Sequence, residues 1–239
     1  ASSLLALAQA GAAELKPVWE ASGLKEPESA VYDPARDVIY VSNVNGEPAA
    51  KDGNGFIAKL SPKGEVVALE WVKGLDAPKG MALVGDTLYV SDMMANAIWV
   101  LEGGRFAEWL RDDALDHPNG LLAQDGRILV ASWGRDIAAD FSTKVPGHVK
   151  VVEVATKKIA SLGAGTPLGN LDGIEPDGAG GYTVTDWLNG AIFHVSADGR
   201  ATRLLDLNQG SADHAFIAKD RLVVLPMMLD GKVVAYRLD

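Results

Sequence analysis

The sequence predicts an all-β fold, specifically a β-propeller of five four-stranded blades. Three observations predict it: one motif recurs five times at blade-length spacing, short strands alternate with turn residues, and the N-terminal segment can supply the one strand that the last copy lacks. The chain has 239 residues, of which 26 are Gly and 11 are Pro. It is therefore long enough to bury one substantial core and has the turns that many short strands require.

The five copies share one order of elements. They begin with residues 27–43, 78–92, 118–132, 171–186 and 212–227. Their starts are about 40 to 53 residues apart, which is the usual length of a propeller blade. Unrelated strands of a β-sandwich would not explain why one order of motifs recurs at this spacing.

Each copy contains a short first strand, a polar turn and a second strand rich in β-branched and aromatic residues. We expect these second strands at residues 38–41, 87–90, 128–131, 182–185 and 222–225. Third strands follow at residues 56–60, 97–101, 148–152, 191–195 and 232–238. Fourth strands follow at residues 65–70, 105–110, 158–162 and 200–205.

The fifth copy stops after its third strand, at Asp239. The segment 14–21 precedes the first copy and has the character of a fourth strand. Pairing this strand, around Pro17 and Trp19, with the C-terminal strands completes a ring and removes open sheet edges. This arrangement gives five blades; a ring of six blades is the alternative.

Charge and composition limit the possible partners. The formal net charge is −10, which argues against nucleic acid or an anionic membrane as the main partner. The chain has no Cys, which excludes disulfides, thiolate catalysis and zinc–thiolate sites. The four His residues are scattered and form no paired motif of the kind found in zinc sites.

The first thirteen residues differ from the rest of the chain. They are apolar and rich in small residues, and Ala8-Gln9-Ala10 has the form of a signal-peptidase site. Residues 1–13 are interpreted as a signal-peptide remnant or a short N-terminal helix, and residues 14–239 as one propeller domain. The first interpretation predicts a periplasmic or secreted protein; otherwise the protein is cytoplasmic.

One residue at the start of each first strand should lie near the propeller axis. These residues are Glu28, Lys79, Asn119, Asp172 and Asp213, and His214 follows the last of them. Four of the five offer oxygen atoms, which suit a hard cation such as Ca²⁺. The alternative is that each of these residues only caps a loop or bonds a turn.

The motifs Pro27-Glu28-Ser29, 117–121 (HPNGL) and 171–174 (LDGI) resemble those of the gluconolactonase, senescence-marker-protein and luciferin-regenerating-enzyme family. The resemblance runs from about Val18 to the end of the chain. It implies a calcium-dependent propeller that hydrolyses lactones, with Glu28, Asn119 and Asp172 as metal ligands.

The chain departs from that family in the number of blades. Members usually have six, and the blade before the NG motif supplies an Asn that has no counterpart here. We interpret this as the loss of one blade, with the join near residues 87–93, where two equivalent strands would be fused in register.

These features predict a lactonase, a metal-dependent hydrolase of lactones or related cyclic esters. Asp172 is the candidate catalytic residue, since it could position or deprotonate water. The candidate substrate-binding residues are Lys79, Trp133, Asp213 and His214. The alternatives are a non-catalytic propeller that binds a ligand or protein, and a lyase that opens a cyclic ester by elimination.

Overall fold

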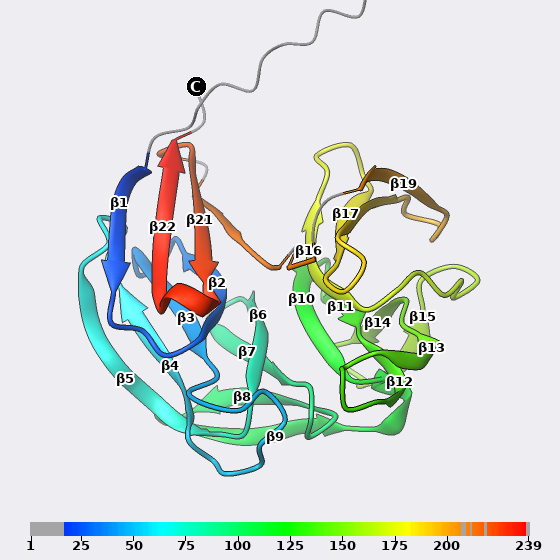
Figure 1. Cartoon of the computed structure of the whole chain (residues 1–239), viewed down its shortest axis with the longest axis horizontal. Coiled ribbons are helices and arrows are strands. Elements are labelled where there is room, and N and C mark those ends of the chain that lie inside the picture. Colours follow the sequence, from blue (N-terminus) through cyan, green and yellow to red (C-terminus); the bar gives the residue numbers. More distant parts are fainter. Residues whose placement is uncertain (1–16, 207–208, 211, 218, 238–239) are drawn as a thin grey trace, which may run out of the picture.

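The computed structural model describes residues 17–206, 209–210, 212–217 and 219–237, and it is a five-bladed β-propeller (Figure 1). The segment 1–13, interpreted above as a signal remnant or a helix, lies outside the described residues. No helix among the described residues is long and apolar enough to span a membrane.

The blades are five antiparallel sheets of four strands each, numbered here in chain order. Blade 1 consists of β2 (Pro27–Asp33), β3 (Val38–Asn43), β4 (Gly55–Leu60) and β5 (Val66–Leu75). Blade 2 consists of β6 (Pro78–Val84), β7 (Thr87–Asp92), β8 (Ala97–Glu102) and β9 (Arg105–Arg111). Blade 3 consists of β10 (Pro118–Gln124), β11 (Arg127–Ser132), β14 (Val149–Glu153) and β15 (Ile159–Ser161). Blade 4 consists of β16 (Leu171–Pro176), β17 (Tyr182–Asp186), β18 (Ala191–Val195) and β19 (Ala201–Asp206).

Blade 5 joins the two ends of the described chain, as the sequence predicts. It consists of β20 (Ala215–Ile217), β21 (Leu222–Met227), β22 (Lys232–Arg237) and β1 (Pro17–Ser22). Strand β1 pairs antiparallel with β22, with Trp19 opposite Ala235. The indole N–H of Trp19 donates to the Pro62 carbonyl of blade 1 at 2.9 Å, so the closing strand also contacts the next blade.

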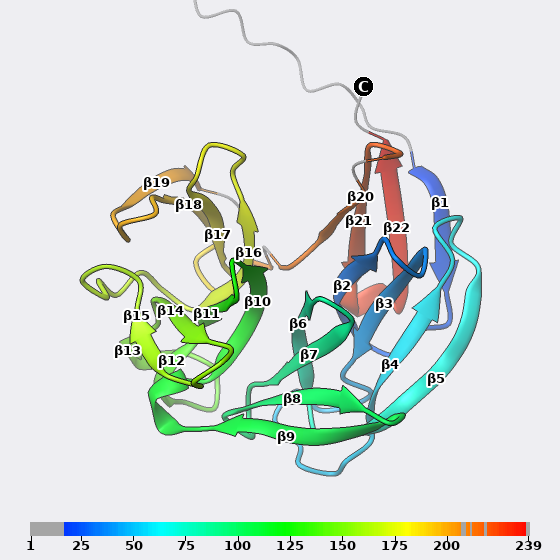
Figure 2. The same ribbon diagram turned by 180° about the vertical axis from the view of Figure 1, so that it is seen from behind.

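Apolar side chains from neighbouring blades form the core. Alternate residues of the strands point to opposite faces of each sheet, so each blade presents an apolar face to each of its neighbours. The four buried clusters formed by described residues join blades 5 and 1, 1 and 2, 2 and 3, and 3 and 4. In Figures 1 and 2, blades 4 and 5 lie farther apart than the other neighbouring blades.

Some elements differ from the prediction. A two-stranded hairpin of β12 (Gly134–Ile137) and β13 (Thr143–Pro146) interrupts blade 3, where the sequence predicts no strand. Half of its eight strand residues are polar and only Gly134 is buried, so they lack the apolar alternation that marks a core strand. Two short 3₁₀ helices, η1 (Asp113–Leu115) and η2 (Met228–Asp230), are further elements that the sequence analysis does not predict.

Candidate functional site

The inner strands of the blades converge because small residues follow the site residues. A Cβ atom on Gly80 would lie 2.5 Å from the carbonyl oxygen of Asn119 in the next blade. A Cβ atom on Gly120 would lie 2.0 Å from the carbonyl oxygen of Asp172. Both distances are too short for any side chain, so only glycine allows these strands to approach so closely.

A similar but less close contact joins blades 4 and 5, and a hydrogen bond joins blades 5 and 1. A Cβ atom on Gly173 would lie 3.0 Å from the Cα atom of Asp213. At the equivalent position of blade 1, the Ser29 hydroxyl donates to Oδ2 of Asp213 at 2.7 Å. Successive site residues are thus held around the axis by backbone packing and one buried hydrogen bond.

Hydroxyl groups on the second strands support this arrangement. The Ser91 hydroxyl donates to the Asn119 carbonyl at 2.6 Å, across the junction of blades 2 and 3. Within blade 4, the Gly173 N–H donates to Oγ1 of Thr185 at 2.8 Å. These bonds fix the backbone that carries Asn119 and Asp172, and such positioning is what a binding or catalytic site needs.

A cavity of about 530 Å³ opens on this ring. Glu28, Lys79, Asn119 and Asp172 all line it and are at most 6% exposed. Asp213 is equally buried beside them but does not line the cavity. The size lies within the range of small-molecule sites.

Three of these side chains carry a buried oxygen with no hydrogen-bond partner: Oε2 of Glu28, Oδ1 of Asn119 and Oδ1 of Asp172. Among the described residues only one other buried side-chain polar atom lacks a partner, Nε1 of Trp99. Buried polar atoms in folded proteins are nearly always bonded, and an exception calls for an explanation such as an ion. In the described part of the chain, no three His, Cys, Asp or Glu side chains form a group that could hold a metal ion. The three residues with an orphan oxygen are two carboxyls and one amide.

Burial is the largest influence on the pKa values of Glu28 and Asp172, the two carboxyls that carry an unpartnered oxygen. It raises the pKa of Asp172 well above its usual value, and the nearby charges of Glu28 and Asp213 raise it further. Burial also raises the pKa of Glu28, which the positive charge of Lys79 partly offsets. Nζ of Lys79 lies 3.9 Å from Oε1 of Glu28. The other oxygen of this carboxyl, Oε2, has no hydrogen-bond partner.

Two further carboxyls extend this acidic group. Burial raises the pKa of Asp213 to about 7, although the Ser29 hydroxyl opposes the shift. Burial and the charge of Asp213 raise the pKa of Glu175, on β16, to about 8. A group of closely spaced carboxyls binds protons in this way when no cation balances its charge.

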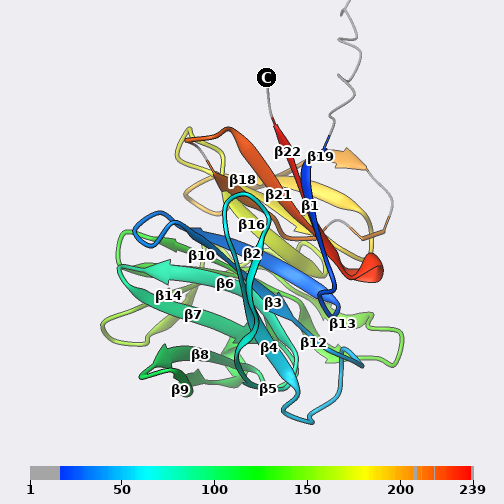
Figure 3. The ribbon, with the colours of Figure 1, turned by 90° about the vertical axis from the view of Figure 1, so that its left-hand side faces the viewer.

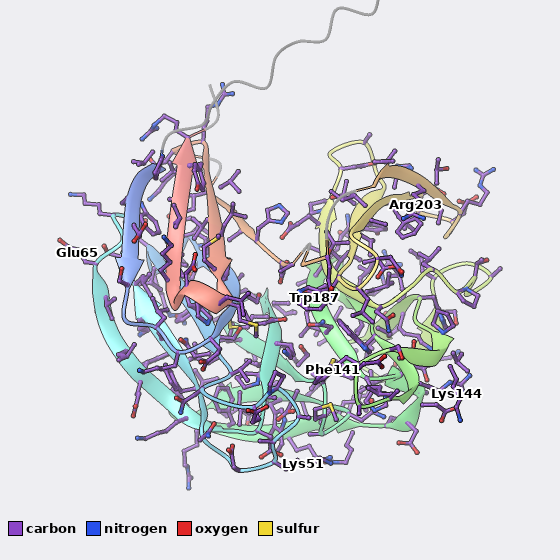
Figure 4. The ribbon with its side chains drawn as sticks, viewed as in Figure 1. Lys51, Glu65, Phe141, Lys144, Trp187 and Arg203 are labelled. Carbon is purple, nitrogen blue, oxygen red and sulfur yellow. The ribbon has the colours of Figure 1, made fainter. Side chains whose placement is uncertain are left out.

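Aromatic residues form part of the cavity wall. Trp133 and Trp187 both line it, with ring centroids 6.3 Å apart. Phe141 joins them from the β12–β13 hairpin, and Figure 4 shows Phe141 and Trp187 near the middle of the ring. The hairpin and η2 project from the same face of the propeller (Figure 3).

Neither His214, a candidate from the sequence, nor His117 of the HPNGL motif lines the cavity. His214 is partly buried, and burial lowers the pKa of its imidazole. Its backbone N–H donates to Oδ1 of Asp213, so both oxygens of that carboxyl are bonded. Nδ1 of His117 bonds to the Gly134 carbonyl at 2.8 Å and holds the start of the hairpin.

Several lining residues have no equivalent in the repeat and were not identified from the sequence. Phe141 lies in the unpredicted hairpin, Pro48 in the loop between β3 and β4, and Met228 and Leu229 in η2. Each lies in a segment between the repeated strands, where the five copies differ. The only sequence signal for Phe141 is a single aromatic residue in an insertion without a strand pattern.

Comparisons with known proteins agree with the architecture. The sequence matches no protein-family model and no curated protein. A solved structure of glutaminyl cyclase from Myxococcus xanthus aligns with a TM-score of 0.62 and 13% identity, covering 94% of this chain and 96% of that chain. A structure of a nidogen/laminin complex aligns with a TM-score of 0.57 and 16% identity, covering 89% and 80%.

This chain is a β-propeller. At these identities the likeness shows the fold alone. One of the two neighbours is an enzyme and the other comes from a protein–protein complex, so the propeller itself does not decide between catalysis and binding.

Proposed function

We propose that this propeller is a metal-dependent hydrolase of lactones or related cyclic esters, with a divalent cation of the Ca²⁺ type held by Glu28, Asn119 and Asp172. One observation carries the proposal: each of these three residues has a buried oxygen with no partner. They are also the three residues that the resemblance to the gluconolactonase family implies as ligands.

The charge of the site supports a divalent cation. With the carboxyls of Glu28, Asp172 and Asp213 ionised and Lys79 protonated, the ring carries two negative charges. A divalent cation balances this charge and offsets the cost of burying the carboxylates. Ca²⁺ accepts carboxylate and amide oxygens in flexible geometry, which suits two carboxylates and one amide.

When bound, the cation would supply Lewis-acid polarisation of the ester carbonyl. Lys79 is the one cationic side chain among the described lining residues, and it would attract the ester oxygens of the substrate. Asp172 would accept the hydrogen bond of the attacking water and take its proton. Trp133 would hold the ring of the substrate over these groups. The negative charge of Asp213 would favour binding of the cation.

The test is hydrolysis of a panel of γ- and δ-lactones, followed as acid release, with Ca²⁺ and with a chelator. We expect turnover that requires Ca²⁺, and a loss of at least about 100-fold in kcat/KM for Asp172→Asn, as for removal of a catalytic group. Hydrolysis in ¹⁸O-labelled water should place one labelled oxygen in the product.

An unsaturated product without label would indicate a lyase instead. No turnover above background on any lactone, with the protein folded and Ca²⁺ bound, would indicate the non-catalytic binding propeller and overturn the proposal.

A further inference from the structure

The polar groups of the cavity are confined to its two ends. Glu28, Lys79, Asn119 and Asp172 form the innermost part, at the starts of the inner strands. Gln209 and Asp230 are exposed and therefore mark the mouth. The described wall residues between these ends are apolar or aromatic, for example Met93, Trp133, Phe141, Trp187, Pro226 and Met228.

The aromatic wall offers little hydrogen bonding to a ligand. The indole N–H of Trp133 donates to the Phe141 carbonyl at 2.8 Å and is not free for a substrate. Among the described wall residues this leaves the indole N–H of Trp187 as the remaining side-chain N–H. A ligand along this wall meets mainly carbon.

The hairpin that supplies Phe141 is held firmly in place. Phe141 has a φ of 63°, which is uncommon for a bulky residue and is found where surrounding contacts impose it. Nδ2 of Asn170 donates to the Trp133 carbonyl and to Oγ1 of Thr143, both at 3.0 Å. These bonds tie the base of the hairpin to the wall and fix Phe141 at the cavity.

Exposed apolar side chains beside η2 also line the cavity. Leu229 in η2 is 98% exposed and lines the cavity, and Met227 before it is 36% exposed. A single exposed apolar residue needs no explanation, but here two flank a cavity whose wall is also apolar. The apolar surface therefore continues from the wall to the outside.

We infer that the substrate is a lactone that carries an apolar alkyl or aryl substituent, and that polyhydroxylated lactones are poor substrates. This inference rests on the proposed function and names its substrate class. Each hydroxyl placed along the wall would lose its hydrogen bonds to water and gain none. Each methylene buried there gains about fourfold in binding.

The test compares kcat/KM in Ca²⁺ for γ-lactones whose 4-alkyl chain lengthens from methyl to hexyl, below their micelle concentrations, and for glucono-δ-lactone. We expect a rise of about two- to fourfold per methylene over the first few carbons. A preference for the sugar lactone, or no dependence on chain length, would overturn the inference while leaving lactone hydrolysis intact.

Two variants locate the effect. Phe141→Ala should reduce the gain per methylene, because it removes part of the wall. Phe106 packs in the core between blades 1 and 2, so Phe106→Ala should keep the gain. Equal slopes in both variants would place the apolar contact elsewhere and contradict the role of this wall.

A binding measurement separates this inference from the proposed function. Calorimetry with 4-alkyl lactams of the same ring size, which the site should not cleave, should show affinity that rises with chain length. Rising affinity without lactone turnover would support the apolar cavity and reject only the hydrolase. Flat affinity would reject the substrate class whether or not lactones are hydrolysed.

Discussion

Glu175 should make the stability of the propeller depend on pH. Its pKa is raised from 4.5 to about 8, chiefly by burial and then by the charge of Asp213. As pH rises above about 4.5, the unfolded chain releases this proton while the folded chain keeps it. Stability must therefore fall with rising pH until about pH 8, where the folded carboxyl also ionises.

The size of this effect follows from the shift. One unit of pKa corresponds to about 1.4 kcal/mol, so the full shift would cost up to about 5 kcal/mol between pH 5 and pH 9. Because Glu175 is only partly buried by surface area, solvent screens part of this cost. We expect Glu175→Gln to be more stable than the wild type by about 2 to 5 kcal/mol at pH 9, with little difference at pH 4.

Urea denaturation of both proteins without Ca²⁺, from pH 4 to pH 9, measures this difference. Exposed Glu153 provides the control, and Glu153→Gln should leave the pH dependence of the wild type unchanged. The reasoning fails if Glu175→Gln shows the same loss of stability with rising pH as the wild type.

Two further predictions concern how the ring is assembled. Gly120→Ala places a Cβ atom 2.0 Å from the Asp172 carbonyl oxygen, so it should destabilise the fold by about 3 kcal/mol. It should also abolish Ca²⁺ binding in calorimetry, and a normal Ca²⁺ affinity would refute the close packing. Trp19→Phe removes the hydrogen bond to Pro62 and should lower stability by about 1 kcal/mol, measured in urea; an unchanged midpoint would mean that the bond contributes nothing to closure.

The fold could be predicted from the sequence because each blade repeats one pattern of strands and turns. The closing strand was predictable too, since the fifth copy lacks a fourth strand and the segment around Trp19 supplies it. The positions of Glu28, Asn119 and Asp172 follow from the same repeat, because equivalent residues of a ring must lie near its axis.

Only part of the cavity wall could be predicted: Trp133 directly follows a repeated strand and was a candidate from the sequence, whereas Pro48, Phe141 and Met228 lie in segments that no repeat governs. Phe141 reaches the cavity through a hairpin whose polar residues show no core pattern, and its position depends on a bond from Trp133. The separation of blades 4 and 5 also has no sequence signal: each of these blades has an ordinary strand pattern.

The effect of Ca²⁺ on thermal stability tests the central claim most directly, because it needs no substrate. At a Ca²⁺ concentration of about 100 times Kd, binding adds about 2.7 kcal/mol and should raise Tm by about 5 to 10 °C. Asp172→Asn should lose this shift. Asp92→Asn should keep it, because Asp92 is equally buried but its oxygens accept the N–H groups of Asp76 and Ala95. A Tm that does not respond to Ca²⁺ in the wild type, or an equal response in Asp172→Asn, would contradict the account.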